Sequence, residues 1–146
     1  MELTPIQKQI MEGKICPYCK KESQYVDSKI VYGKSYGMIY LCTDCDAYVG
    51  VHKGTDNAKG RLANAELRQI KKKAHFYFDP IWQFKLMTRH EAYKWLSDKI
   101  KLPPEYTHIG MLGKEKTIEV IVKSIVYLEN HGYFEIEAEI QKDPEW

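Results

Sequence analysis

The sequence predicts an α+β fold: a four-cysteine zinc ribbon built from β-hairpin knuckles, packed on a small helical body and followed by a C-terminal strand. Three observations predict it. The cysteines form two C-x-x-C pairs, several segments have helical apolar spacing, and a final segment alternates apolar and acidic residues. We expect the 146 residues to form a single domain, 1–146, with the ribbon at 14–51, the body at 58–130 and the strand at 133–141.

The cysteine spacing predicts a metal site. Cys16 and Cys19 form one pair, Cys42 and Cys45 form the other, and 22 residues lie between the pairs. A C-x-x-C turn places two sulfurs on one side, so two such turns supply the four thiolates that a structural Zn²⁺ prefers. A closed four-thiolate site has no open position for water, which favours one structural zinc ion over a catalytic one. Iron, which also accepts four thiolates, is the alternative metal.

The segments around the cysteines fit a ribbon. Residues 25–26 and 30–32 are strand-like, 32–37 is rich in turn formers, and 38–41 and 47–51 predict two further strands. Before the first pair, Thr4 and Pro5 suit the start of a short helix that would run to about Glu12 and end at Gly13.

The helical body begins after a polar loop at residues 52–60. Apolar residues then recur every three or four positions, which predicts a helix that starts between Arg61 and Asn64. We expect Asp79 and Pro80 to end this helix and begin another, in which Ile81, Trp82 and Phe84 pack. The helix's apolar residues are Ala63, Leu67, Ile70, Ala74 and Phe78.

Two more helices complete the predicted body. Thr88 followed by Glu91 is a capping box, and the helix that it opens should run to about Lys101 before two prolines. A third helix is predicted near residues 115–129. Its expected buried face consists of Ile118, Ile121, Val122, Ile125 and Leu128.

Charge is unevenly distributed along the chain. The net charge is +2, but residues 51–101 carry 12 basic and 5 acidic side chains, and residues 102–146 carry 4 basic and 9 acidic ones. This pattern excludes a uniformly basic nucleic-acid coat and favours a basic middle segment. The sequence has neither a spanning apolar stretch nor a signal-peptide pattern, so we expect a cytoplasmic protein without a membrane partner or disulfides.

Linked motifs resemble a known family. They include Cys-Pro-Tyr-Cys at the first pair, the run from Cys42 to Thr55, and the Gly-Arg-Leu-Ala-Asn at 60–64. In these and later motifs, residues 14–125 resemble a zinc-finger-containing domain found mainly in phages and prophages. The resemblance implies a zinc-bound phage protein, active in the host cytoplasm, and supplies no reaction. The family pattern favours a cysteine where this chain has Thr107, so no second metal site is expected.

The basic middle segment suggests DNA or RNA binding. Its cations would neutralise phosphates, while Tyr32, Tyr36 and Tyr40 would stack on unpaired bases. A solvated helix face and tyrosines that build a thin core are the alternative interpretations. The predicted nucleic-acid or ligand contacts are His52, Lys53, Arg61, Asn64, Arg68, Lys72, Lys73 and His75.

Two other functions compete with nucleic-acid binding. A protein-interaction module would bind or inhibit a host protein, or form a homodimer through the C-terminal strand. A nuclease-like hydrolase would need a metal or base among His52, Asp56, His75 and Asp79, which have no recognisable spacing. The sequence assigns no catalytic residue, and an enzyme is the less favoured interpretation.

Overall fold

The fold is described from a computed structural model, which describes residues 3–132. The chain divides into two compact units. The first, here the ribbon unit, comprises the chain up to Arg68 together with Gly110–Gly113, and the second, here the helical unit, contains the rest. The α+β prediction is confirmed, whereas the strand expected at 133–141 lies outside the described residues, and the single-domain organisation stays a prediction.

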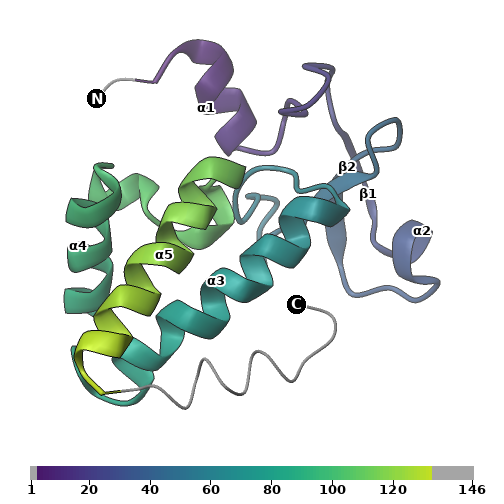
Figure 1. The fold of residues 1–146 in the computed structure, drawn as a ribbon. Coiled ribbons are helices and arrows are strands. Elements are labelled where there is room, and N and C mark those ends of the chain that lie inside the picture. Colours follow the sequence, from purple (N-terminus) through teal and green to yellow (C-terminus); the bar gives the residue numbers. More distant parts are fainter. Residues whose placement is uncertain (1–2, 133–146) are drawn as a thin grey trace. The chain divides into compact units, whose positions relative to one another are not determined.

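A three-stranded antiparallel sheet forms the centre of the ribbon unit. Its strands are β1 (Gln24–Asp27), β2 (Met38–Cys42) and β3 (Ala47–Gly50), in the order β1-β2-β3. Figure 1 shows β1 beside β2, with α2 following β1. The central strand supplies the buried side chains Ile39 and Leu41. The two strands expected at residues 38–41 and 47–51, after the first cysteine pair, are confirmed.

The predicted N-terminal helix is also present, as α1 (Pro5–Met11). The Thr4 hydroxyl accepts a hydrogen bond from the Gln7 backbone N–H, and the Gln7 side chain accepts one from the Thr4 N–H, which completes a capping box. Such reciprocal bonds satisfy N–H groups that a helix start otherwise leaves unpaired.

The strand predicted at residues 30–32 is wrong. This segment is the short helix α2 (Lys29–Tyr32). The Asp27 carboxylate accepts a hydrogen bond from the Lys29 N–H at 2.9 Å, and Gly33 ends the helix in the left-handed conformation at φ 74°. Local capping at both ends thus overrides the strand preference of the β-branched residues between them.

Three α-helices build the helical unit, although the first of them begins in the ribbon unit: α3 (Ala65–Gln83), α4 (Arg89–Ile100) and α5 (Lys114–Asn130). Figure 1 shows all three. Between α4 and α5 lie the short 3-10 helices η1 (Pro104–Tyr106) and η2 (Ile109–Met111). The predicted capping box of α4 is present, and both of its hydrogen bonds, between Thr88 and Glu91, are formed. The largest fully buried side chains of the unit include Phe78, Ile81, Leu96, Ile100, Ile109 and Leu128.

The break predicted at Asp79 and Pro80 is wrong, because α3 continues through Pro80 to Gln83. The Pro80 carbonyl still accepts a hydrogen bond from the Phe84 N–H at 2.9 Å. A proline inside a helix costs about 3 kcal/mol. Burying an apolar side chain such as Phe78 or Ile81 contributes about 1.5–3 kcal/mol each, which offsets that cost. Phe84, expected to pack, is 55% exposed.

The predicted buried face of α5 is also corrected. Its buried residues are Thr117, Val120, Ser124 and Leu128. Ile118 and Val122, which the hydropathy pattern assigned to the core, are 41% and 50% exposed. Tyr127, on the buried side of the helix, contacts Trp95 of α4 with ring centroids 5.1 Å apart. The buried face of α5 is therefore determined by packing against α4 and not by side-chain hydropathy.

None of the helices described between residues 3 and 132 combines the length and the apolar character that a membrane span requires.

Candidate metal centre and tyrosine pocket

The four cysteines converge in the ribbon unit. Their sulfur atoms all lie within 4.8 Å of one another, and Cys19 Sγ is 3.6 Å from Cys42 Sγ. Thiolates held about 2.3 Å from a tetrahedral zinc lie about 3.8 Å from each other, so this spacing fits one structural zinc ion. The cysteines are free rather than joined in disulfides, with Cys16 and Cys42 buried. Four thiolates fill a tetrahedron and leave no position for substrate or water.

The two cysteine turns share one backbone form. The residue after each pair adopts the left-handed conformation, Lys20 at φ 65° and Asp46 at φ 50°. Each turn closes an antiparallel pairing: Ile15 with Glu22 around the first, and Cys42 with Ala47 around the second. Left-handed backbone at such a residue is uncommon and costs energy. Neither residue is glycine, so no sequence signal marks this conformation.

Side chains outside the cysteine pairs support the second turn. Arg68 Nη1 donates to the Asp46 carbonyl at 3.1 Å and to the Ala63 carbonyl at 2.7 Å. The Arg68 guanidinium also lies 4.2 Å from the centre of the Tyr48 ring, a cation–π contact. Beneath the turns, Leu62 is fully buried and belongs to the same apolar cluster as Cys16 and Cys42.

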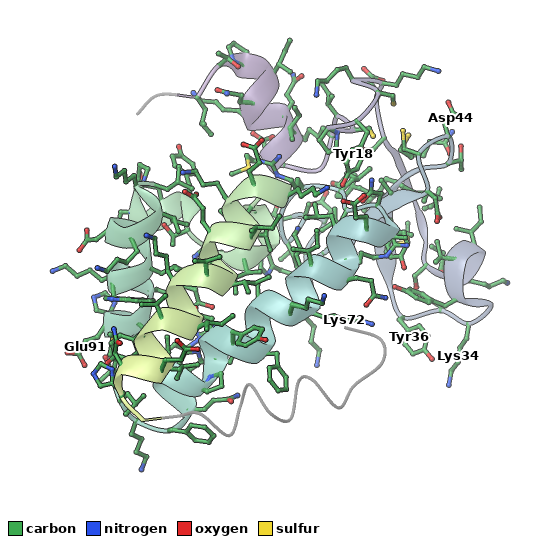
Figure 2. The ribbon with its side chains drawn as sticks, in the orientation of Figure 1. Tyr18, Lys34, Tyr36, Asp44, Lys72 and Glu91 are labelled. Atoms are coloured by element: carbon green, nitrogen blue, oxygen red, sulfur yellow. The ribbon has the colours of Figure 1, made fainter. Side chains whose placement is uncertain are left out.

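The middle residues of the two turns, Tyr18 and Asp44, are labelled in Figure 2 on either side of a group of sulfur atoms. The Tyr18 hydroxyl accepts a hydrogen bond from the Asn64 N–H at 3.0 Å, which ties the first turn to the segment before α3. Desolvation by burial raises the pKa of Tyr18, so this hydroxyl stays protonated at neutral pH. Lys21 Nζ lies 3.2 Å from Asp44 Oδ2, an exposed ion pair between the two turns.

The thiols differ in acidity when no metal balances their charge. The Lys21 backbone hydrogen bond lowers the pKa of Cys19. Desolvation raises the pKa of Cys42 and raises that of Cys45 to about 12. Because thiolates rather than thiols bind zinc, metal binding must displace the protons that these groups hold.

Several predicted ligand contacts have structural roles. Arg61 Nε donates to the Met111 carbonyl at 2.8 Å, and burial lowers the pKa of the Arg61 guanidinium. The Asn64 side chain accepts from the Leu67 N–H at 2.9 Å and so caps α3. Together with Arg68, these residues hold the fold of the ribbon unit.

The other predicted contacts are divided between the units. His52 and Lys53 lie in the exposed loop after β3, while Lys72, Lys73 and His75 lie on α3 in the helical unit. Lys72 is exposed and Lys73 half-buried. His75 Nδ1 lies 3.2 Å from Asp79 Oδ2, so Asp79 pairs with this histidine instead of capping a new helix. The ligand role of these eight residues stays a prediction.

A pocket in the ribbon unit contains a second group of functional candidates. Its volume is about 960 Å³, at the upper end of the roughly 300–1,000 Å³ of ligand sites. Four tyrosines line it, Tyr25, Tyr32, Tyr36 and Tyr48, together with two cations, Lys53 and Lys59, and one carboxylate, Asp56. We call it the tyrosine pocket. Tyr36 is 72% exposed, and Figure 2 shows Tyr36 and Lys34 at the end of the ribbon unit that carries α2.

The tyrosine rings are fixed by one another. Tyr32 meets both Tyr36 and Tyr48 edge to face, with ring centroids 5.6 Å and 5.8 Å apart. The Tyr32 hydroxyl donates to the Tyr48 hydroxyl at 3.2 Å, and this bond raises the pKa of Tyr32 to about 12. Tyr40, expected to stack on bases, instead packs on Tyr25 and donates to the Asp56 carbonyl.

The sequence indicated only part of this pocket. Tyr32, Tyr36 and Lys53 were predicted contacts, and Lys59 lies in the same predicted polar loop, while Tyr25 had no pattern to mark it as a contact. They meet because β1, β2 and the loop after β3 are brought together by the antiparallel sheet.

Residues 12–126 match a family described as a zinc-finger-containing domain, so the chain belongs to that family. No curated protein and no solved structure matches the chain.

Proposed function

We propose that this zinc-finger-containing protein is a nucleic-acid-binding accessory protein whose tyrosine pocket binds single-stranded DNA or RNA. The observation that carries the proposal is the pocket itself, in which four tyrosines and two lysines face one space. The phage origin and cytoplasmic location of the protein belong to the same proposal and rest on the sequence alone.

The pocket suits an unpaired strand for a physical reason. Every base has an apolar face, and stacking on an aromatic side chain contributes about 1–3 kcal/mol per base. Tyr36 and Tyr25 are exposed enough to receive a base, and Lys53 and Lys59 can neutralise the neighbouring phosphates. In a duplex the bases are stacked on each other and their faces are closed to such contacts.

The zinc ion has an indirect role in this proposal. Cys42 ends β2 and pairs with Ala47, the first residue of β3, so the metal site fixes the turn between the two strands. Tyr48 follows in β3 and forms one wall of the pocket. The metal therefore stabilises the pocket without contacting the bound nucleic acid.

The test is fluorescence anisotropy with labelled single-stranded and duplex oligonucleotides at low and moderate salt. We expect tighter binding of single strands and a salt dependence from phosphate contacts. Tyr36→Ala should weaken binding about 5-fold or more, whereas Tyr36→Phe keeps the ring and should bind nearly as the wild type does. Lys53→Ala and Lys59→Ala should reduce the salt dependence.

A control variant separates the pocket from the basic helix. Lys72→Ala removes an exposed cation of the helical unit and should leave pocket binding unchanged. If Lys72→Ala weakens binding while the pocket variants do not, α3 is the binding surface. If the zinc-loaded protein binds no oligonucleotide at low salt, the proposal fails and the host-protein alternative takes its place.

A further inference from the structure

The loop that borders the tyrosine pocket is held in a fixed form. The His52 N–H donates to the Asn57 carbonyl at 2.9 Å, and the Thr55 hydroxyl donates to the His52 carbonyl at 2.8 Å. The Asn57 N–H donates to the Thr55 hydroxyl at 3.1 Å. The Tyr40 hydroxyl, from β2, donates to the Asp56 carbonyl at 2.6 Å. These bonds fix the backbone of the loop that carries Asp56 beside the pocket.

The Asp56 carboxylate is the one acidic group among the pocket-lining residues, and within residues 3–132 it has no hydrogen-bond or ion-pair partner. Three of the hydroxyls nearby are engaged. The Ser28 hydroxyl accepts from the Tyr36 N–H at 2.7 Å, and the hydroxyls of Tyr32 and Tyr48 bond to each other. Asp56 is therefore the one pocket-lining side chain that carries a negative charge and offers a ligand only hydrogen-bond acceptors.

We propose, on the basis of the function proposed above, that Asp56 makes the tyrosine pocket selective for guanine among unpaired bases. A carboxylate only accepts hydrogen bonds, and its two oxygens match two parallel N–H donors. The Watson–Crick edge of guanine presents two such donors side by side, N1–H and the N2 amino group. This edge is free only in a single strand.

The other bases fit the carboxylate less well. Adenine and cytosine each present one amino group beside an acceptor nitrogen, which would face a carboxylate oxygen. Thymine and uracil present one N–H between two carbonyl oxygens, which the carboxylate repels. An unmatched acceptor in such a site loses a hydrogen bond and leaves polar groups unpaired.

The experiment compares labelled nonathymidylates that carry guanine, hypoxanthine, adenine, cytosine or thymine at the central position. A bidentate contact distinguishes bases by about 1–3 kcal/mol, so we expect guanine to bind about 10-fold more tightly than thymine. Hypoxanthine, which lacks the N2 amino group, should lie between them. Asp56→Asn should reduce the preference for guanine over thymine to within about 2-fold. The thymine oligonucleotide should bind to this variant at least as tightly as it binds to the wild type, because a negative charge is removed.

A matched control is Glu22→Gln, which removes one exposed acidic charge of the ribbon unit outside the pocket and should keep the guanine preference. Zinc content and circular dichroism verify that each variant is folded. Equal binding of all five oligonucleotides, or a preference that survives Asp56→Asn, overturns the guanine inference while leaving the proposed function in place. Absence of binding to every oligonucleotide overturns the proposed function itself.

Discussion

The two units of this protein are stabilised in different ways. In the ribbon unit, the buried cluster that the structure describes around the metal site consists of only four residues, Leu62, Ala47 and the zinc ligands Cys16 and Cys42. In the helical unit, bulky side chains such as Phe78, Ile81 and Leu96 are fully buried. The first unit therefore depends on a metal, whereas the second relies on the removal of apolar surface from water.

The difference has a functional meaning. The sheet of the ribbon unit leaves Tyr25, Tyr32 and Tyr36 substantially exposed, so these rings contribute less to a core. A small unit that commits its aromatic residues to a pocket needs another source of stability, and a structural zinc site supplies it. In the helical unit Phe78 and Tyr77 are buried and contribute to the core, although Phe76 and Phe84 are exposed.

The largest expected effect is that of the metal. Chelation of zinc, or Cys16→Ser, should unfold the ribbon unit, because structural zinc contributes an apparent 10–16 kcal/mol or so in small zinc domains. Metal analysis should give one zinc and no iron per chain, and hydrogen exchange should show protection lost in β1 to β3 but retained in α3 to α5. Lys21→Ala, which removes only an exposed ion pair, should keep its zinc. A chelated protein that melts like the zinc-loaded one would contradict the assignment.

The converse change tests the helical unit. Phe78→Ala should lower the free energy of unfolding by about 3–5 kcal/mol, because it removes a fully buried ring. Phe84→Ala, at a 55% exposed position, should change it by about 0.5 kcal/mol or less. Chemical denaturation measures both. Neither variant should lose zinc, and zinc release by Phe78→Ala would show that the two units do not differ as described.

A glycine of the ribbon unit gives a smaller effect of steric origin. A Cβ atom added at Gly60 would lie 2.1 Å from the Gly110 carbonyl oxygen, whereas one at Gly50 would meet nothing within 4 Å. Gly60→Ala should therefore cost about 1–3 kcal/mol, the usual range for forced overpacking. Gly50→Ala is the matched control and should be close to neutral. Equal thermal stability of the two variants would refute the close backbone approach.

The smallest effects concern a device that both units share. Thr4 caps α1 in the ribbon unit and Thr88 caps α4 in the helical unit, each through a capping box. Thr4→Ala and Thr88→Ala should each cost about 0.5–2 kcal/mol, measured by thermal unfolding. If the units unfold separately, each substitution should shift only its own transition; a shift of both transitions would show that they are coupled.

The two boxes should differ in their response to pH. The Thr88 backbone N–H lowers the pKa of Glu91, whereas the partner in the first box, Gln7, does not titrate. A carboxyl with a lowered folded-state pKa stabilises the fold above its unfolded-state pKa, and this contribution is lost as pH falls through the folded-state value. Glu91→Gln should therefore flatten the acid side of the stability profile, and Gln7→Ala should leave its shape unchanged. Parallel profiles for wild type and Glu91→Gln would contradict this.

Local patterns predicted local structure well. The predicted helix start at Thr4 and the predicted capping box at Thr88 depend on residues a few positions apart, and both are present. The predictions failed where distant contacts compete with local preference. Pro80 stays inside α3 because its neighbours are buried, and Ile118 is exposed because packing against α4 selects another face of α5.

The sequence by itself determined the metal site, because two C-x-x-C pairs leave few other uses for four cysteines. It also determined the family, through the linked motifs along residues 14–125. It also determined the α+β class, since the period of apolar residues specifies helices and strands. Only the tertiary structure decided that Arg61 and Arg68 support the ribbon, and that Tyr25, Asp56 and Lys59 share one pocket. The physical reason is that a side chain's role depends on which neighbours the strands and loops bring to it, and those neighbours are distant in sequence.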